Sequence, residues 1–427
     1  MNRSFACSLL AALALVSSMS VLLPAASGAY EFPRRPLTSN ELTKNSLTMS
    51  GAVAGWISCV PDPIVDWDPL TCEVWVYDAD GVGPAHAITD NSVEDECVAI
   101  DHHDVVFRRG VGAGQVVLRD LDAGETILSS AGIDSVFHAC PQISSTRVVW
   151  ERGGQLVVYD RALDTERVVG SNVSYPDLSG DYLVWQQDTD AASEVWFLDA
   201  SSPANTPERL TSNAISDERP TVHAVTAFLG ATSPGVAWYS YVASHYEIMS
   251  WNGSTTTPIT EMSARSHYFP QLTGYSAGLF FFEQPAIAWT PTGPLEVLYC
   301  TTCDGDPANI HGLPASDPFL AGSPYTSLEA IDGGWIVFSR IFPFPASQFD
   351  IGFFEIDGEV MTPITDDAEL DDTATLGFRS VPPVGPVVVW RRTVGTDNQI
   401  FYAPEPGAPA LAALLTLGAL LRRRRGC

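Results

Sequence analysis

The segment Gly274-Tyr275-Ser276-Ala277-Gly278 matches the Gly-x-Ser-x-Gly pattern of a hydrolase nucleophile elbow. That elbow requires a strand, a sharp turn and then a helix, which together hold the serine hydroxyl exposed. Here the motif runs into Leu279-Phe280-Phe281-Phe282, which has the composition of another strand. It also aligns with an ordinary turn between strands at Ser179-Gly180-Asp181-Tyr182. We therefore expect a turn at this motif, and no motif in the chain nominates a catalytic nucleophile.

A second group of residues shares one position in the repeats, just before a predicted inner strand. His138, Asp217 and His267 each stand three residues before a proline that opens a predicted inner strand of a repeat. Arg219 and Arg265 flank them. If the repeats close into a ring, the segments that lead into these strands surround one mouth of its channel, where pockets often form. These five residues are our candidate ligand site, although we favour the alternative that they cap strand ends or link neighbouring repeats.

Acidic residues gather in three loops, and carboxylates are ligands for calcium. The loop Asp304-Gly305-Asp306-Pro307-Ala308-Asn309 resembles part of a calcium loop but lacks the glycine at the sixth position and the glutamate at the twelfth. Further acids cluster at 366–372 and at 188–194. Solvated surface loops are the simpler interpretation, so the sequence predicts no cofactor apart from weak calcium binding, and no metal site can be assigned to particular residues.

The cysteines indicate an oxidising compartment. Six cysteines remain after the two ends of the chain are set aside as processing signals, and an even number in an exported chain indicates disulfides. Cys97 and Cys140 hold equivalent places in neighbouring repeats, Cys59 and Cys72 flank one hairpin, and Cys300 and Cys303 lie in one loop. We expect these three pairs, but the sequence does not determine the connectivity.

These residues must be positioned by a repeated arrangement of strands. An aromatic residue that ends a β-prone run recurs every 35–57 residues, close to the length of a four-stranded propeller blade. A second β-prone run follows each one, and several repeats end in Leu-Thr or Ile-Thr. The recurring aromatics are Trp56, Phe107, Trp150, Trp185, Trp238, Phe281, Phe338 and Trp390. The pattern predicts an all-β propeller over residues 30–403, with eight blades favoured and seven as the alternative.

The strand before several of these aromatics has the form Cys140-Pro-Gln-Ile-Ser, Tyr175-Pro-Asp-Leu-Ser or Phe269-Pro-Gln-Leu-Thr. Together with the Leu-Thr endings, this layout resembles the TolB-like β-propellers. That resemblance implies the fold and says little about activity. The last repeat lacks an outer strand, whereas the first segment, Arg35-Pro36-Leu37-Thr38, has the form of one. We therefore expect the N-terminal strand to complete the last blade and close the ring.

Both ends of the chain have features of targeting signals. Residues 1–29 have a basic start, a short apolar run and small residues before Ala29, as in a secretory signal peptide. Residues 404–427 resemble the PEP-CTERM sorting signal of Gram-negative bacteria, with a Pro-Glu-Pro motif, a short apolar helix and an arginine cluster. The residues that carry this resemblance are Pro404, Glu405, Pro406, Arg422, Arg423, Arg424 and Arg425.

The sorting resemblance implies recognition by an exosortase-like membrane enzyme, contact with the membrane through the tail, and a final place at the cell envelope, the cell surface or the extracellular matrix. A plain tail anchor is the alternative. The formal net charge of −29 makes nucleic-acid binding unfavourable, because such a surface repels phosphate backbones.

These observations leave two classes of function. The first is a non-catalytic binding scaffold for a glycan, a peptide or an envelope protein. The second is a secreted glycan-active hydrolase or lyase that uses the channel. We favour binding over catalysis, because no catalytic motif survives inspection and propellers change function through their loops.

Overall fold

The computed structural model describes residues 34–404 except 39–42, 61–70, 82, 111–113, 134–139, 190–191, 227–231, 261–264, 276–283, 292–296, 302, 315–316, 318, 321–324, 333, 342–348, 367–368, 381–384 and 395–396. These residues belong to one compact unit, Phe32–Cys427. Among them the one helix is the short 3-10 turn η1, Pro307–Asn309. The rest of the regular structure is β-strand, as the sequence predicts.

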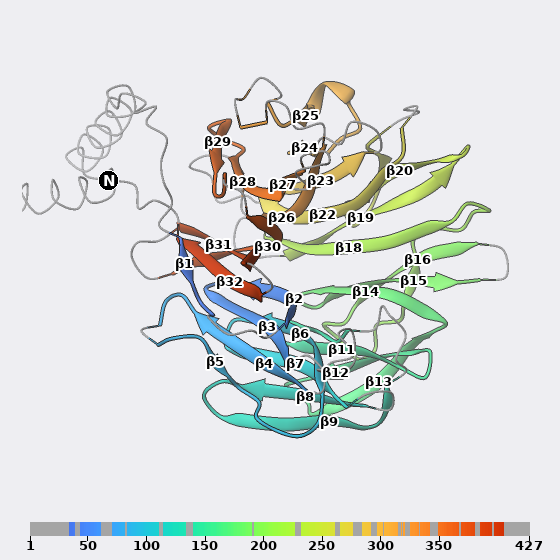
Figure 1. Cartoon of the computed structure of the whole chain (residues 1–427). Helices are drawn as coiled ribbons and strands as arrows, with labels where there is room; N and C mark the ends of the chain where they lie inside the picture. The colour runs from blue at the N-terminus through green and yellow to red at the C-terminus, as the bar shows by residue number, and fades with distance from the viewer. Residues whose placement is uncertain are drawn as a thin grey trace, which may run out of the picture. The chain divides into compact units, whose positions relative to one another are not determined.

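Eight four-stranded antiparallel sheets form the eight blades of a β-propeller (Figure 1). Blades 1 to 4 comprise β2(Thr43–Ser50), β3(Val53–Val60), β4(Thr71–Asp78) and β5(His86–Ala87); β6(Asp95–Asp101), β7(Asp104–Arg109), β8(Gly114–Asp120) and β9(Gly124–Ile133); β10(Gln142–Ile143), β11(Arg147–Arg152), β12(Gln155–Asp160) and β13(Thr165–Ser171); β14(Val173–Ser179), β15(Tyr182–Asp188), β16(Ser193–Asp199) and β17(Glu208–Arg209).

Blades 5 to 8 comprise β18(Asp217–Thr226), β19(Thr232–Val242), β20(His245–Trp251) and β21(Thr256–Pro258); β22(His267–Tyr275), β23(Gln284–Pro291), β24(Leu298–Cys300) and β25(Ile310–Gly312); β26(Tyr325–Asp332), β27(Trp335–Ile341), β28(Phe349–Glu355) and β29(Val360–Pro363); β30(Leu370–Arg379), β31(Gly385–Val394), β32(Asp397–Pro404) and β1(Arg35–Pro36). The predicted eight blades are confirmed, and the seven-blade alternative is wrong.

The first strand of each blade lines a central channel. Each of these innermost strands packs against the innermost strand of the next blade, and β30 of blade 8 packs against β2 of blade 1. The ring is therefore closed. Residues at the two ends of these strands surround the two ends of the channel, so the starts of β14, β18 and β22 lie at the same mouth.

The second strand of each blade carries a large aromatic ring at an equivalent buried position. At most 1% of each residue is exposed, and burying a ring of this size contributes about 4–6 kcal/mol before entropy costs. The residues are Trp56, Phe107, Trp150, Trp185, Trp238, Trp289, Phe338 and Trp390. The predicted position in blade 6, Phe281, lies outside the described residues, and Trp289 of β23 fills the place instead. The phenylalanine run is more β-prone than this alanine-containing strand, which is why composition favoured it.

The recurring Ile-Thr or Leu-Thr phrase attaches the outer edge of a blade to its third strand. The Ile364 N–H donates to the carbonyl of Ile351 at 2.9 Å, and the Ile351 N–H donates to Thr365 Oγ1 at 2.7 Å. The hydroxyl thus continues the ladder beyond the last backbone pair. The same reciprocal pair joins Ile88 and Thr89 to Val74, Leu210 and Thr211 to Val195, Ile259 and Thr260 to Ile248, and Leu37 and Thr38 to Ile400.

The N-terminal strand completes the last blade, as predicted. β1 pairs antiparallel with β32, with Arg35 opposite Tyr402 and Pro36 opposite Phe401. Figure 1 shows the blue β1 beside the red β32. Leu37 and Thr38 then hold Ile400 through the reciprocal pair described above. The closure covers an edge of β32 that would otherwise be open to pairing with another chain.

Three disulfides have the expected pairings. Cys59–Cys72 joins opposite residues of β3 and β4, and Cys300–Cys303 closes the loop after β24. Cys97–Cys140 links the innermost strands of blades 2 and 3 near their starts. The two cysteines are 43 positions apart in the sequence, the longest separation of the three, so this bridge restricts the unfolded chain most.

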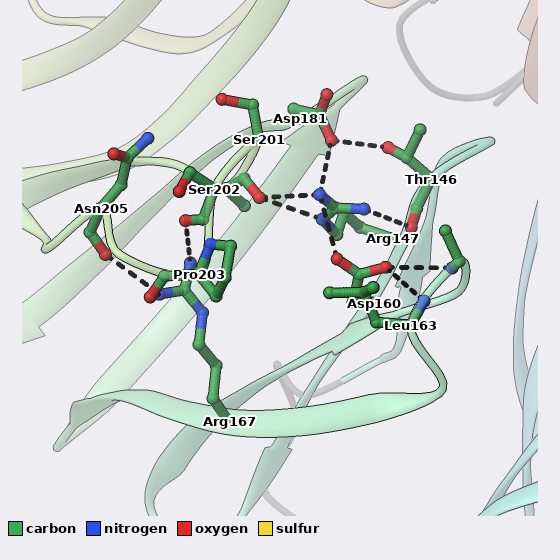
Figure 2. Close-up of polar contacts among 12 residues, drawn as sticks. Thr146, Arg147, Asp160, Leu163, Arg167, Asp181, Ser201, Ser202, Pro203 and Asn205 are labelled. Atoms are coloured by element: carbon green, nitrogen blue, oxygen red, sulfur yellow. Dashed lines mark hydrogen bonds and ion pairs between the residues drawn. The ribbon is translucent and has the colours of Figure 1, made fainter.

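Two arginines join blades 3 and 4 (Figure 2). Buried Arg147 donates to the Ala200 carbonyl from both Nε and Nη2, at 3.2 and 2.8 Å. Its Nη2 also lies 3.3 Å from Asp160 and from Asp181. Arg167 donates to three backbone carbonyls of segment 202–205. Both arginines line a cavity of about 200 Å³, but carbonyls and carboxylates occupy their donors, so the arrangement is a joint between blades.

Candidate ligand site at the channel mouth

The innermost strands share a β-bulge close to their starts. The pairing register shifts there in seven of the eight blades. In six of these the bulge holds a non-glycine residue with φ between +47° and +53°, a conformation that costs about 1–3 kcal/mol. The six residues are Ser46, Cys97, Tyr175, Arg219, Phe269 and Thr373. A bulge redirects a side chain away from the regular ladder, and such strain concentrates at functional sites.

Three bulge residues from consecutive blades form a stack. The guanidinium carbon of Arg219 lies 4.6 Å from the ring centroid of Tyr175 and 4.8 Å from that of Phe269. Its Nη2 donates to the Tyr175 hydroxyl at 3.3 Å, and its backbone N–H donates to Gln186 Oε1 at 3.2 Å. The guanidinium therefore bridges β14, β18 and β22 through two aromatic faces.

A row of tyrosines extends this stack across blades 5 and 6. Ring centroids are 4.9 Å apart between Tyr241 and Tyr246, and 5.0 Å apart between Tyr246 and Tyr268. Tyr268 lies 5.9 Å from Phe269, while buried Tyr239 supports the row from below. Two members are well exposed, Tyr241 at 45% and Phe269 at 52%. We call Tyr175, Arg219, Tyr241, Tyr246, Tyr268 and Phe269 the mouth cluster.

Arg109, Arg219 and Arg392 each lie over an aromatic ring, and Arg219 differs from the other two because it has no ion pair among the described residues. Arg109 pairs with Asp95 at 3.0 Å, and Arg392 pairs with Asp371 at 2.6 Å. No carboxylate in the described part of the chain forms an ion pair with Arg219. Burial raises the pKa of the adjacent Glu218 carboxyl, and the charge of Arg219 opposes that rise.

Asp217 and His267 lie inside the blades, next to the mouth cluster. Asp217 is 1% exposed and accepts from the indole N–H of Trp238 at 3.0 Å and from the Ser240 hydroxyl. His267 is 4% exposed, and its Nδ1 accepts from the Trp289 indole at 3.0 Å. Asp217 and His267 thus each accept the hydrogen bond of the buried indole N–H in their own blade. Burial raises the pKa of Asp217 and lowers that of His267 to about 4, which keeps the imidazole neutral.

The other predicted site residues have different outcomes. Arg219 belongs to the mouth cluster, Arg265 is exposed just before β22, and His138 lies outside the described residues. Nothing in the structure tests ligand binding by any of the five, so that role stays a prediction. Tyr175 and Phe269 were missed as site residues, although they occur in the aromatic-proline phrase that was interpreted only as a strand signature.

A cavity of about 510 Å³ occupies the channel beyond the mouth. All eight innermost strands contribute to its lining, and the volume is in the range of small-molecule pockets. Three carboxylates and one histidine are among the lining residues: Asp101, Asp177, Asp332 and His223. Asp177 accepts from the Thr221 hydroxyl at 2.9 Å and from the Val222 N–H at 2.8 Å, so it links blade 4 to blade 5.

The acidic loops have internal partners. Asp304 accepts from the Asp306 N–H at 3.0 Å and from the Asn309 amide, and Asp306 caps the 3-10 turn η1. Glu194 accepts from Thr211 and Arg209. In the part of the chain that is described, no group of three His, Cys, Asp or Glu side chains is arranged to hold a metal ion. Calcium binding stays an untested prediction, which calorimetry with CaCl₂ on the purified domain would test.

Other predicted features fall largely outside the described residues. Ser276 of the Gly-x-Ser-x-Gly segment lies there, although Gly274 and Tyr275 end strand β22. The signal peptide and residues 405–427 of the sorting tail also lie there, whereas Pro404 ends β32. No helix in the described portion is long and apolar enough to cross a membrane.

Comparisons with known proteins support the fold alone. No family model matches the chain, and no curated protein matches its sequence. The TolB-like resemblance therefore stays a prediction. Among solved structures, the β-propeller domain of the Trilobed protease from Pyrococcus furiosus aligns with 10% identity and a TM-score of 0.47, covering 77% of this chain and 99% of that domain.

Two whole peptidases are also similar in their propeller parts. Prolyl oligopeptidase B from Galerina marginata aligns with 9% identity and a TM-score of 0.50, covering 83% of this chain and 55% of that one. A puromycin-hydrolyzing peptidase from Mycobacterium tuberculosis aligns with 12% identity and a TM-score of 0.48, covering 86% and 61%. This chain thus spans little more than half the length of either peptidase, and the likeness extends to the β-propeller fold.

Proposed function

We propose that the chain is a non-catalytic binding propeller whose ligand docks on the mouth cluster. The observation that carries this proposal is the stack of Tyr175, Arg219 and Phe269 on strained bulge residues of three consecutive blades. Exposed aromatic rings with a few polar groups are typical of binding sites, and tyrosine and arginine dominate binding energy at interfaces. A glycan, a peptide or an envelope protein could each supply the faces that such rings contact.

The proposed setting is the outside of a Gram-negative cell. The signal-peptide pattern of residues 1–29 and the Pro-Glu-Pro, apolar and arginine parts of residues 404–427 support export and sorting by an exosortase-like membrane enzyme. The three disulfides suit an oxidising compartment. Deleting residues 404–427 should release the protein into the medium, and unchanged retention at the envelope would contradict this address.

A secreted hydrolase or lyase is the second candidate, because Asp177 and His223 line the same cavity. Burial raises the pKa of Asp177, as a general acid requires. Incubating the protein with cell-surface polysaccharide and measuring new reducing ends tests this candidate. Turnover that is lost in Asp177→Asn but retained in Phe269→Ala would favour catalysis in the channel over binding at the mouth.

The binding proposal is tested with glycan and peptide arrays probed with the disulfide-bonded domain. The double variant Tyr241→Ala/Phe269→Ala removes the two exposed rings, and we expect it to lose the array signals of the wild type. The double variant Ile127→Ser/Val168→Ser is the matched control, since it removes two exposed apolar side chains from the outer strands β9 and β13. Identical array profiles for the wild type and the mouth variant would overturn the proposal.

A further inference from the structure

We propose that the mouth cluster recognises a glycan that carries a single carboxylate, such as a terminal uronic acid. This inference rests on the proposed function, because it specifies the ligand of the same site.

The rings favour a saccharide over a peptide strand. Centroid separations of 4.9, 5.0 and 5.9 Å along Tyr241, Tyr246, Tyr268 and Phe269 give a continuous row of faces and edges. The C–H bonds of a pyranose ring stack well on such faces. An extended peptide would instead need a free strand edge for backbone hydrogen bonds. The free edges of β14, β18 and β22 are interrupted here by their bulges, so no continuous ladder is available.

Arg219 is the residue that would recognise the carboxylate of the ligand. Its guanidinium is fixed in orientation by the rings of Tyr175 and Phe269, and one donor is used by the Tyr175 hydroxyl. A guanidinium has five N–H donors in a planar fork that matches a carboxylate. Since no described carboxylate pairs with Arg219, a ligand carboxylate is the group that best completes its hydrogen bonding.

The protein's charge limits the ligand to few carboxylates. A formal net charge of −29 repels a polyanion over distances comparable to the Debye length. One carboxylate at the end of an otherwise neutral glycan gains the contact with Arg219 and meets little of this repulsion. A polyuronate gains the same contact but must approach through the negative field of the whole molecule.

The experiment measures the affinity of the complete disulfide-bonded domain for three probes: a neutral oligosaccharide, the same oligosaccharide ending in one glucuronic acid, and a polyuronate. We expect the wild type to prefer the mono-acidic probe over the neutral one by about tenfold or more, the range of a charge-assisted hydrogen bond. Polyuronate binding should be weak at low salt and should strengthen as salt screens the repulsion.

Substitutions of Arg219 test whether this residue causes the preference for the mono-acidic oligosaccharide. Arg219→Gln should bind both oligosaccharides equally, whereas Arg219→Lys should retain part of the acidic preference because it keeps the charge. Arg152→Gln is the matched control, since this arginine of blade 3 pairs with Glu166 and is not part of the mouth cluster. Melting temperatures of all variants establish that they are folded before affinities are compared.

The outcomes separate this inference from the proposed function. If Phe269→Ala abolishes binding of neutral glycans or peptides while acid gives no advantage, the mouth binds a ligand but the acidic specificity is wrong. If Arg219→Gln leaves the acidic preference intact, the inference is also wrong. If no ligand depends on Phe269, the proposed function itself fails.

Discussion

Single side chains at the strand starts hold the buried aromatics in place. Asp217 accepts hydrogen bonds from Trp238 and Ser240, His267 accepts from Trp289, and Asp371 accepts from the Trp390 indole at 2.8 Å. A buried indole N–H without an acceptor is costly, and in these three blades the polar residue at the strand start removes that cost. The indole N–H groups of Trp56 and Trp150 have no such acceptor among the described residues. The strand starts are therefore structural support for the mouth cluster beside them.

Replacing Asp217 tests this support. Asp217→Ala leaves the Trp238 indole without its Asp217 acceptor in the interior and should lower the free energy of unfolding by about 2 kcal/mol or more. Asp217→Asn keeps an acceptor oxygen and should cost clearly less. Urea unfolding of the two variants is the measurement, with exposed Asp122→Ala as the control. Equal losses for Ala and Asn would show that the acceptor oxygen is not what matters.

His267 should make stability depend on pH. Its pKa is lowered from 6.5 to about 4 in the folded state, so at pH between these values the unfolded chain binds a proton that the folded protein excludes. Stability should therefore fall as pH falls through this window. His267→Asn accepts a hydrogen bond without titrating, and its melting temperature should fall less between pH 7 and pH 4.5. An equal fall in melting temperature between pH 7 and pH 4.5 for the wild type and His267→Asn would contradict this role.

At the scale of residues, sequence indicated which side-chain types lie near the strand starts, but it could not show their directions, which depend on backbone geometry. Arg219 is a candidate because it flanks Asp217; it lies in the mouth cluster, and its role in ligand binding stays a prediction. Tyr175 and Phe269 were missed as candidates, because their direction depends on a bulge with positive φ that an alternating pattern does not reveal. Asp217 and His267 were placed at the correct end of their strands, but sequence does not show that they point inward.

At the scale of elements, short outer strands are held by a hydroxyl as much as by backbone pairing. β29 has four residues, and Thr365 then accepts from the Ile351 N–H at 2.7 Å. The repeat of this contact explains why Leu-Thr and Ile-Thr could be recognised as a blade ending. The outer strand ends before the threonine, which accepts the Ile351 N–H through its side chain. The Leu-Thr and Ile-Thr phrases therefore mark the end of a blade without giving the length of its last strand.

Thr365→Val tests the hydroxyl contact with little change in shape. The Ile351 N–H would lose its partner in a buried position, so we expect a loss of about 1–3 kcal/mol in unfolding free energy. Thr126→Val, at an exposed position of β9, is the control and should change stability by less than about 0.5 kcal/mol. Equal stability of both variants and the wild type would show that the Thr365 hydroxyl does not stabilise the blade.

At the scale of the whole molecule, the ring depends on one short strand from the other end of the chain. The aromatic spacing and the orphan Leu37-Thr38 segment were enough to predict eight blades and their closure. The order of the blades follows from repetition, which sequence displays directly. The joints between blades, such as Arg147 with Ala200, were not predictable because they unite residues from different repeats.

Removing β1 should weaken the closed ring. A protein that begins at residue 39 lacks the partner of β32 and exposes its edge, so we expect a lower melting temperature and concentration-dependent association. A protein that begins at residue 32 keeps β1 and is the control. Light scattering and thermal unfolding of both proteins are the measurements. Identical behaviour would show that the closure contributes little.

The central claim is that the mouth cluster is where a ligand binds. Hydroxyl-radical footprinting with and without the mono-acidic oligosaccharide tests it directly. Without the oligosaccharide, exposed apolar side chains are oxidised both in the mouth cluster and elsewhere on the surface. Phe269 and Tyr241, 52% and 45% exposed, should be protected by the probe, while Ile127 and Leu163, 53% and 57% exposed, should be oxidised as before. Uniform oxidation of all four residues under conditions where the probe is bound would contradict the claim.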